Sequence, residues 1–452
     1  MDIELLLHNT HLESMAAFQR KDPHLRRLQS MTYQFHSATI DEIPRKIPGV
    51  YTLVGGRQIG KTTLLKQWML SLLEGGIKPD AIRFISCELI SDMHSLNRVV
   101  NELLDEMPQN ELIYIILDEI TYVLDWDRAI KHLAETGLFE NAIVIISGSD
   151  SVLIKDAMKR FPGRRGKADI VDFHYYPLSF REILNLKNVF PANHINYDDE
   201  AVNVLYQEFN KYLIHGGYLS AINEYSKDNV ISRATLSTYS DWVRGDVLKR
   251  NKSEHYLRDI LSAIFKHYNK QISWRDIVKG LRIDHYQTAI DYTHLLESMD
   301  VVYIQEALLE DKLTGAPKKN RKLMYTDPFI FHALKAWLKP SMDSFNEQIL
   351  PMINDSKLCS DLVESTVVNH FRRYYPTYYI KADGEVDIAY IHDNKFWPIE
   401  VKWTRQIRKE DLKQILKYRN GKILARVNSE SLVNSTPIIP LPIALLGIGE
   451  QV

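Results

Sequence analysis

The feature that most constrains this chain is a short glycine-containing segment that follows an apolar run near residue 50. Gly55, four intervening residues and Gly60-Lys61-Thr62 fit the pattern G-x-x-x-x-G-K-[ST]. The apolar run from Val50 to Val54 predicts a buried strand, and a helical pattern begins directly after the segment. A loop between such a strand and helix points backbone N–H groups into one concavity, at the positive end of the helix dipole. The sequence therefore predicts a phosphate-binding loop.

We expect this loop to bind a nucleotide together with Mg²⁺. Lys61 is expected to reach the β- and γ-phosphates, and the Thr62 hydroxyl to ligate the metal ion. The alternative, a glycine-rich turn with a chance lysine, is disfavoured by the strand before it and the helix after it. The expected binding residues of the loop are Gly55, Gly56, Arg57, Gln58, Ile59, Gly60, Lys61, Thr62 and Thr63.

From Gly49 to about Leu184, strand and helix patterns alternate. Further strands are predicted over residues 82–87, 112–117 and 142–147, with a helix around 95–106. Strands that alternate with helices of this length predict a parallel sheet with crossover helices. The fold class expected for this part is therefore an α/β P-loop NTPase.

Two strand ends in this part carry polar residues that suit nucleotide hydrolysis. The strand at 112–117 is followed by Asp118, expected to hold Mg²⁺, and Glu119, expected to orient or deprotonate the attacking water. Ser147 ends the next strand and is a candidate polar group near the γ-phosphate. An Asp-Glu pair alone is a weak signal, but after a phosphate loop it becomes strong.

Arg164 and Arg165 lie between glycines in Phe161-Pro162-Gly163-Arg164-Arg165-Gly166. A guanidinium on such a loop can stabilise the transferring phosphoryl group, either within the chain or on a neighbouring subunit. A solvated basic turn is an equally good interpretation of the same residues.

Size and composition limit the classes of protein that fit. At 452 residues, about three domains are expected. A net charge of −2 excludes a uniformly basic surface, although it permits a local basic groove. Two distant cysteines and the lack of any run of about 18 apolar residues predict a cytoplasmic protein without a membrane segment. The predicted domains are 1–190, the ATPase with its helical lead-in; 191–265, a helical lid or connector; 266–345; and 346–452.

Residues 266–345 show two helical stretches, then a strand, a basic turn and a returning strand. Ser273 is a plausible N-cap for the first helix, 287–299 forms the second, and strands follow at 301–304 and 323–325. This order is typical of a winged-helix domain, in which the second helix can enter a DNA major groove. Winged helices also dock on proteins, so both partners remain open here.

Residues 346–452 predict a small α/β domain with a metal site. A helix at 361–374 precedes strands at 378–382, 386–391 and 397–401, a helix at 409–418 and a strand at 443–446. Asp387 and Glu400 on adjacent strands can share one Mg²⁺, and Lys402 projects to the same face as Glu400. Lys402 can then orient or activate water against a phosphodiester.

Several other residues of this last domain are candidates for supporting roles. Glu364 in the preceding helix is a further candidate metal ligand, and Gln414 can support the site from the following helix. Local positive charge that suits a phosphate backbone comes from Lys381, Lys395, Arg405, Arg408 and Lys409.

The chain resembles AAA-type ATPases of archaea and bacteria that join an ATPase module to a winged helix and a nuclease-like C-terminal domain. The matching segments are 55–63, 117–120, 147–149, 163–166 and 177–182, the last being Pro177-Leu178-Ser179-Phe180-Arg181-Glu182, with an echo at His215-Gly216-Gly217-Tyr218. The resemblance implies that Arg164 or Arg165 is an arginine finger, which suggests a homo-oligomer.

The last domain resembles the restriction-endonuclease-like (PD-(D/E)XK) superfamily. The resemblance assigns Asp387, Glu400 and Lys402 to its two acids and lysine, with Glu364 and Gln414 as accessory positions; Val386-Asp387 replaces the usual Pro-Asp. The favoured interpretation is an Mg²⁺-dependent ATPase that couples nucleotide state to DNA engagement, with a metal-dependent nuclease-like domain. The alternative is a nucleotide-regulated signalling or scaffold switch whose last domain binds DNA or protein without cleavage.

Overall fold

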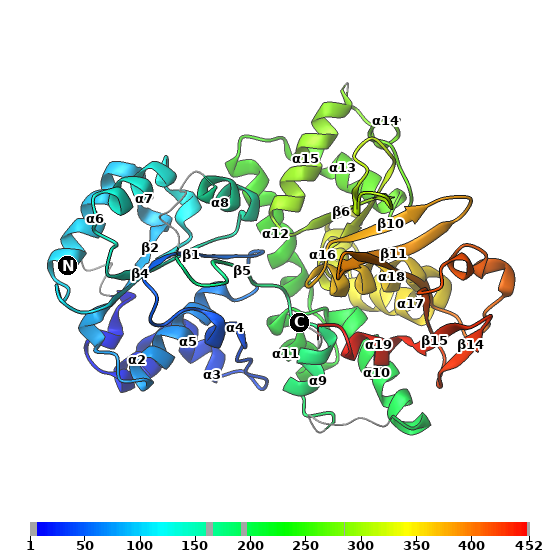
Figure 1. The fold of residues 1–452 in the computed structure, drawn as a ribbon, viewed down its shortest axis with the longest axis horizontal. Helices are drawn as coiled ribbons and strands as arrows, with labels where there is room; N and C mark the ends of the chain where they lie inside the picture. The colour runs from blue at the N-terminus through cyan, green and yellow to red at the C-terminus, as the bar shows by residue number, and fades with distance from the viewer. Residues whose placement is uncertain (1–6, 160–165, 191–196, 284, 450–452) are drawn as a thin grey trace. The chain divides into compact units, whose positions relative to one another are not determined.

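The computed structural model describes residues 7–159, 166–190, 197–283 and 285–449. The chain divides into two compact units, Met1–Tyr176 and Pro177–Val452 (Figure 1). The finer four-part division expected from the sequence stays a prediction. Among the described residues, no helix combines the length and the apolar character that a bilayer crossing requires.

The first unit is built on a parallel sheet whose strand order, over the described residues, is β2-β3-β4-β1-β5. Each predicted strand forms within about one residue of its expected bounds, since long apolar runs in a βα alternation are a strong signal. The strands are β1 (Gly49–Val54), β2 (Ile82–Ser86), β3 (Ile113–Asp118), β4 (Ala142–Gly148) and β5 (Asp172–His174).

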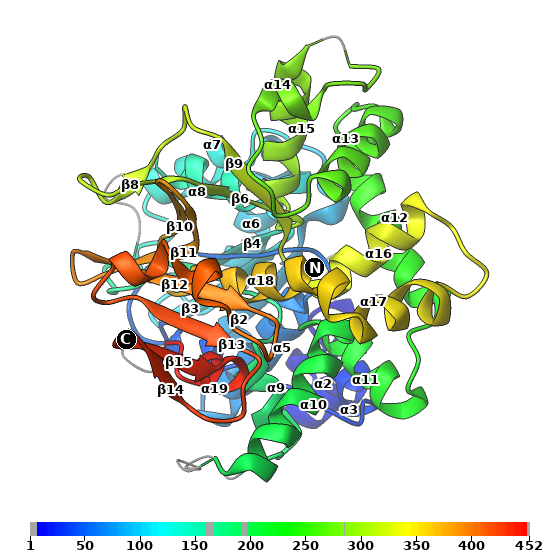
Figure 2. The same ribbon diagram turned by 90° about the vertical axis from the view of Figure 1, so that its right-hand side faces the viewer.

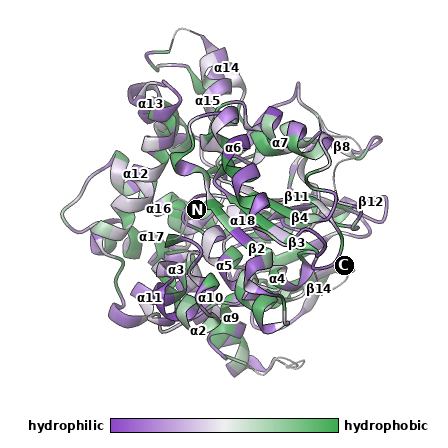
Figure 3. Ribbon diagram, turned by 90° about the vertical axis from the view of Figure 1, so that its left-hand side faces the viewer, coloured by the Kyte–Doolittle hydropathy of each residue, from purple (hydrophilic) through white to green (hydrophobic). Residues whose placement is uncertain are grey.

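Helices cover both faces of this sheet. In Figure 1, α5 lies on one face together with the lead-in helices, and α6 and α7 lie on the other. The apolar sides of α6, α7 and α8 form one core with β1, β3 and β4, and both β3 and β4 are buried along their whole length (Figure 3). The helices are α2 (Met15–Lys21), α3 (Pro23–Gln29), α4 (Thr39–Glu42), α5 (Lys61–Glu74), α6 (Met93–Asp105), α7 (Trp126–Glu135) and α8 (Ser151–Met158).

The lead-in is attached to α5 through a buried ion pair. Lys66 on α5 has its Nζ 3.4 Å from Asp22 Oδ2, and both side chains are fully buried. The same ammonium donates to the His8 carbonyl at 2.7 Å and lies 3.5 Å from the centre of the Phe84 ring. Asp22 also caps α3 by accepting from the backbone of His24 and Leu25. The partners of the buried Lys66 ammonium, Asp22 and His8, both belong to the lead-in, so the lead-in is an integral part of the first unit.

The second unit is mainly helical up to residue 372, and its helices precede and follow a β-hairpin. They are α9 (Phe180–Leu186), α10 (Asp199–His215), α11 (Leu219–Asp228), α12 (Arg233–Lys249), α13 (Glu254–Lys266), α14 (Trp274–Ile277), α15 (Tyr286–Ser298), α16 (Pro328–Leu338), α17 (Leu350–Asn354) and α18 (Ser356–Arg372). Ser273 caps α14 as predicted, by accepting from the Asp276 N–H. After α15, strands β6 (Val302–Glu306) and β9 (Arg321–Tyr325) pair antiparallel, and the connection between them holds β7 (Leu308–Leu309) and β8 (Thr314–Gly315).

A mixed sheet forms the C-terminal part, with order β10-β11-β12-β13-β15-β14 over the described residues. Helix α18 packs against β10, β11 and β12, and Figure 2 shows it behind these strands. The strands are β10 (Thr377–Lys381), β11 (Glu385–His392), β12 (Lys395–Lys402), β13 (Lys422–Ala425), β14 (Ser431–Val433) and β15 (Thr436–Pro440).

Two expectations for this part need correction. Residues 409–418 form two 3₁₀ segments, η6 (Lys409–Leu412) and η7 (Ile415–Lys417), and no α-helix; Leu412 at the end of η6 and Ile415 at the beginning of η7 both pack into the core. Residues 443–446 were expected to form a strand but lie in the short helix α19 (Leu441–Leu446). A four-residue apolar run does not distinguish a strand from a helix, and Pro442 is well suited to the first turn of a helix. Strands β13, β14 and β15 were not predicted.

The Pro177–Glu182 segment, which showed no catalytic logic in the sequence, has a structural role. Arg373 next to the end of α18 donates to the Pro177 carbonyl and to Glu182 Oε2, both at 2.9 Å. His370 Nε2 accepts from the Phe180 N–H at 3.0 Å, while Ser179 and Glu182 form a capping box on α9. The segment thus anchors the beginning of the second unit on α18.

The glycine pair at 216–217 belongs to the same assembly. Leu178 N–H donates to the Gly217 carbonyl at 2.8 Å, and Gly217 N–H donates to Asp327 Oδ2 at 2.9 Å. A Cβ on Gly217 would lie 2.2 Å from the Leu178 carbonyl oxygen, so only glycine permits this approach.

We predict that Asp22→Ala lowers the free energy of unfolding by about 3 kcal/mol, because the buried Lys66 ammonium loses its counter-charge and α3 loses its cap. The matched control is Asp41→Ala, which breaks the exposed Asp41–Arg45 pair and should cost less than about 0.5 kcal/mol. Urea unfolding followed by circular dichroism measures both, and equal effects would contradict a role for the buried pair.

Acid should weaken the anchor at His370. Burial lowers the pKa of His370 to about 4. The unfolded chain takes up this proton below about pH 6.5, whereas the folded state stays neutral, so stability is lost as the pH falls from 6.5 towards 4, by about 1.4 kcal/mol per pH unit. We predict that His370→Gln unfolds in less urea at pH 7.5 but shows a shallower decline between pH 6.5 and 4.5 than the wild type. Parallel declines would show that His370 does not bind the proton.

Candidate functional site

The phosphate-loop site lies where β1 ends and α5 begins. The backbone takes positive φ values at Gln58 (59°) and Gly60 (102°), which shape the loop. A Cβ on Gly55 would lie 2.3 Å from the Tyr175 carbonyl oxygen, so the chain passes too closely there for any other residue. Lys61 is buried and donates from Nζ to the carbonyls of Gly55 (2.9 Å) and Gly56 (3.0 Å). The loop therefore folds around its own lysine.

The acidic strand end meets this loop as the sequence predicts. Thr62 Oγ1 donates to Asp118 Oδ2 at 2.7 Å. Ser147 Oγ donates to Asp118 Oδ1 and accepts from the Glu119 N–H at 3.2 Å. Because β4 lies between β1 and β3, its Ser147 stands between the loop strand and the acidic strand. Burial and the neighbouring Glu119 raise the pKa of Asp118.

Glu119 is held close to the loop lysine. Its Oε1 lies 3.6 Å from Lys61 Nζ, and its Oε2 accepts from Ser149 Oγ at 3.4 Å. Arg57 donates to Ser149 Oγ at 3.4 Å and to the Tyr122 hydroxyl, and it stacks on the Tyr122 ring. The predicted residues thus form one connected polar network, to which Tyr122 is an addition. Arg164 and Arg165 lie outside the described residues.

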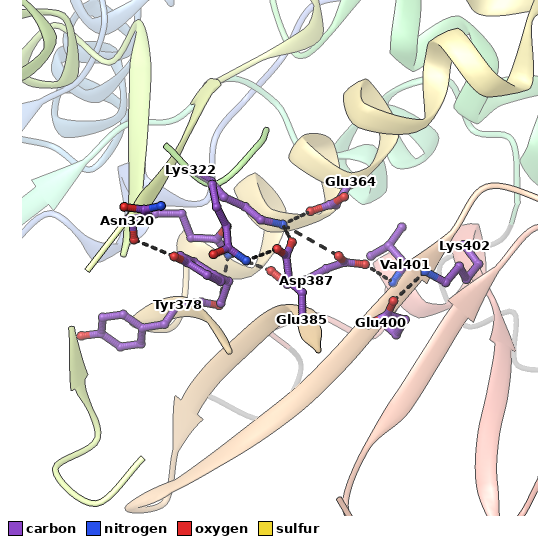
Figure 4. A network of polar contacts seen from close by, with 12 residues as sticks. Asn320, Lys322, Glu364, Tyr378, Glu385, Asp387, Glu400, Val401 and Lys402 are labelled. Carbon is purple, nitrogen blue, oxygen red and sulfur yellow. Dashed lines mark hydrogen bonds and ion pairs between the residues drawn. The ribbon is translucent and has the colours of Figure 1, made fainter. Parts of the chain in front are cut away.

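A second cluster lies in the C-terminal unit, between α18 and β11. Glu364 from α18 and Glu385 and Asp387 from β11 each offer a carboxylate oxygen, and these oxygens lie within 4.8 Å of one another (Figure 4). Glu385 and Asp387 are two positions apart on the strand, so both project to one face. Oxygen donors of this kind suit a hard divalent cation. The residues present therefore fit a metal site. It combines Glu364 and Asp387, two of the predicted ligands, with Glu385, which was not predicted; Glu400, the third predicted ligand, is not part of this group.

Asp387 is fixed from two further elements. Its Oδ2 accepts from the Val401 N–H on β12 at 2.8 Å, and its backbone carbonyl accepts from Gln305 Nε2 on β6 at 3.0 Å. The neighbouring strand β12 thus orients the carboxylate, and the β6–β9 hairpin holds the backbone of Asp387.

Glu400 and Lys402 form a pair beside this cluster, on β12. Lys402 Nζ lies 2.6 Å from Glu400 Oε1, and Figure 4 shows the pair to one side of the three carboxylates. Among the described residues, Glu400 Oε2 is buried without a hydrogen-bond partner. Burial and the nearby Asp387 raise the pKa of Glu400 to about 9. Such an orphaned oxygen next to a lysine is compatible with a missing ligand or a held proton.

Lys322, from β9, lies among the three carboxylates. Its Nζ is 2.8 Å from Glu364 Oε1 and 3.8 Å from Asp387 Oδ1, and it also contacts Glu385; the side chain is 1% exposed. Burial by itself would lower the pKa of Lys322. The negative charges of Glu364, Asp387 and Glu385 have the larger opposite effect, so the pKa of Lys322 is raised. Burial and Asp387 together raise the pKa of Glu364 to about 8.

The remaining predicted residues of the last domain are Gln414 and five basic residues. Gln414 follows η6 and accepts from the Gly384 N–H at 3.2 Å, so it supports the turn before β11. The side chains of Lys381, Lys395, Arg405 and Arg408 are exposed; the side chain of Lys409 is outside the described set. Glu385 was within reach of sequence reasoning through its alternation with Asp387. Lys322 was not, because nothing local links residue 322 to a strand 65 residues later.

Three family models match parts of this chain. The AAA domain family matches residues 48–184, the range that holds the loop, the acidic strand end and Ser147. This match supports an ATP-binding, AAA-type P-loop ATPase. Two families described as domains of unknown function, DUF8612 and DUF4143, match residues 206–341 and 360–442.

The relatives found by sequence are uncharacterized proteins and therefore do not indicate a function. An uncharacterized protein of Haemophilus influenzae is 25% identical over 268 residues, which cover 56% of this chain and 61% of that protein. An uncharacterized protein of Methanocaldococcus jannaschii is 30% identical over 142 residues, 30% of this chain and 28% of that protein. The chain thus spans less than two thirds of either relative.

Among solved structures, a Walker-type ATPase of Pyrococcus abyssi has a TM-score of 0.40 at 16% identity, covering 63% of this chain and 91% of that one. The Orc1 protein of Aeropyrum pernix in complex with DNA has a TM-score of 0.32 at 13% identity, covering 72% and 96%. Similarity this low carries no argument on function, so the assignment depends on the family match and on the geometry of the loop.

Proposed function

We propose that the protein is an Mg²⁺-dependent ATPase that couples its nucleotide state to the engagement of DNA, and that its second unit carries a metal-dependent phosphodiesterase site. The observation that carries the ATPase part is the polar network of Lys61, Thr62, Asp118, Glu119 and Ser147, because it brings together the types of side chain that phosphoryl transfer uses. The AAA domain match over 48–184 supports the same conclusion.

The roles follow from the contacts. Lys61 is bonded to two carbonyls, neutral acceptors that a phosphate can displace, so it is ready to turn to the β- and γ-phosphates. Thr62 and Asp118 are the residues that would hold Mg²⁺, which supplies charge neutralisation on the phosphates. Glu119 would leave Ser149 and Lys61 to position water. Arg164 or Arg165 as a finger between subunits stays a prediction.

The nucleic-acid part of the proposal depends on the second unit. The carboxylates of Glu364, Asp387 and Glu385 with Lys402 nearby have the composition that metal-assisted phosphodiester hydrolysis uses. Exposed Lys381, Lys395, Arg405 and Arg408 would meet a phosphate backbone. The two helices and hairpin of residues 274–325 supply the order of elements found in winged-helix DNA readers.

A second candidate is a nucleotide-regulated switch that binds DNA or protein without cleaving. One observation favours it: the Lys322 ammonium already lies among the carboxylates that the metal ion would need. If the folded chain keeps Lys322 among these carboxylates, no metal ion binds there and nucleic acid is not cleaved, so cleavage has to be measured.

For the ATPase, we predict that Lys61→Ala weakens ATP binding at least about tenfold, because the phosphates lose their buried cation. Glu119→Gln should retain binding and slow hydrolysis by about two orders of magnitude or more, because water is no longer activated. Calorimetry with ATP and Mg²⁺ and a phosphate-release assay measure the two effects. The control, Lys131→Ala, removes an exposed cation on α7. Unchanged turnover in both variants would refute these roles.

For the second site, we predict that Mg²⁺- or Mn²⁺-dependent nicking of plasmid DNA, measured with and without ATP, is lost in Lys402→Ala. Lys227→Ala provides the control, since it removes an exposed lysine from α11 of the same unit that has no role in the proposed site. Nicking that survives in Lys402→Ala would rule out this lysine. If no DNA or RNA form is cut by the wild type, the non-cleaving switch is favoured.

A further inference from the structure

The position of the Lys322 ammonium carries a consequence for metal binding. The three carboxylates that can share a cation offer oxygens within 4.8 Å of one another. Divalent ions bind carboxylate oxygens at about 2.0–2.6 Å, so an ion shared by these oxygens has to lie in the small space between them. Lys322 Nζ is in contact with Glu364 and Glu385 and 3.8 Å from Asp387, which places it in that space (Figure 4).

We infer that Lys322 is a built-in cation that competes with a divalent metal ion for Glu364, Glu385 and Asp387, and that the site admits metal only when this ammonium leaves. The inference deepens the proposed metal-dependent function of the second unit and depends on that cluster being a metal site. It makes the β6–β9 hairpin, which carries Lys322, an autoinhibitory element.

The hairpin holds the ammonium in place through contacts with the C-terminal sheet. Gln305 on β6 donates from Nε2 to the carbonyls of Tyr378 and Asp387, both at 3.0 Å. The Tyr379 hydroxyl donates to the Asn320 carbonyl, one residue before β9, at 2.6 Å. Lys322 is 1% exposed, so it cannot swing into solvent as a surface lysine does. Vacating the metal position therefore requires the hairpin to move relative to β10 and β11.

Charge balance explains why such an arrangement is stable and still reversible. The ammonium supplies a single positive charge to three carboxylates, whereas a divalent ion would supply two. The lysine thus offsets part of the negative charge in the metal-free state, and a divalent ion would offset more of it. A cation of higher charge competes for the same oxygens as soon as the ammonium is withdrawn.

The test is divalent-ion binding without nucleotide, measured by calorimetry with Mn²⁺ and Mg²⁺ on the full chain. We expect Lys322→Met to bind one Mn²⁺ at least about tenfold more tightly than the wild type. Lys319→Met, which removes an exposed lysine just before β9, should match the wild type. The double variant Lys322→Met/Asp387→Asn should lose the gain, which places the new ion at this cluster.

Thermal unfolding gives a second readout that does not depend on cleavage. Lys322→Met should melt at a lower temperature than the wild type in EDTA, because three buried acids lose their counter-ion, and Mn²⁺ should restore its melting temperature. The wild type should respond little to Mn²⁺. Lys322→Gln, which keeps a hydrogen-bond donor towards Glu364, serves as a second variant if Lys322→Met does not fold in EDTA.

Three results would overturn the inference. Equal Mn²⁺ affinity in the wild type and in the folded Lys322 variant would show that the lysine does not compete. A gain that survives Asp387→Asn would place the ion elsewhere. Failure of both Lys322 variants to fold even in saturating Mn²⁺ would show that a metal ion cannot replace the ammonium. If instead the variants gain Mn²⁺ but still cut no nucleic acid, the inference stands and the nuclease part of the proposed function fails.

Discussion

The hydrogen bond from Thr62 to Asp118 is the contact on which the first unit's chemistry depends. It joins the beginning of α5 to the end of β3, two segments separated by 56 positions in the chain. They meet because β3, β4 and β1 are parallel neighbours, so their carboxyl ends share one edge of the sheet. Ser147 at the end of the middle strand bonds the other oxygen of Asp118. A buried carboxylate is acceptable there because two hydroxyls already satisfy it.

The two units treat their buried lysines differently. Lys61 donates to two backbone carbonyls, which are neutral partners that a phosphate can replace, and it has one carboxylate, that of Glu119, at 3.6 Å. Lys322 contacts three carboxylates, which are strong, charged partners. The first lysine is therefore ready for an anionic ligand, and the second already neutralises an anionic site. This difference is why the loop geometry suits nucleotide directly, whereas the second cluster needs a change in the chain before it takes a metal ion.

Helix α18 connects the second unit's carboxylate cluster to the beginning of that unit. Near its end, His370 and Arg373 hold the Pro177–Glu182 segment, and the helix also carries Glu364. In the first unit, Tyr175 N–H bonds to the Val54 carbonyl at 2.7 Å, directly before the phosphate loop. The distinctive segment is explained by this anchoring, without any catalytic task.

The sequence by itself determined the phosphate loop, the acidic strand end and the parallel strands of the first unit, because these features depend on local spacing and long apolar runs. It also predicted a site from Glu364, Asp387, Glu400 and Lys402; the structure places Glu364 and Asp387 in one carboxylate group and pairs Glu400 with Lys402, and the roles of all four stay predictions. It was wrong about residues 409–418 and 443–446, where short apolar runs fit several structures and packing around Leu412 and Pro442 decides. Only the tertiary structure brought Glu385 and Lys322 to the same carboxylates, because the hairpin and the sheet meet through contacts between distant segments that no local pattern encodes.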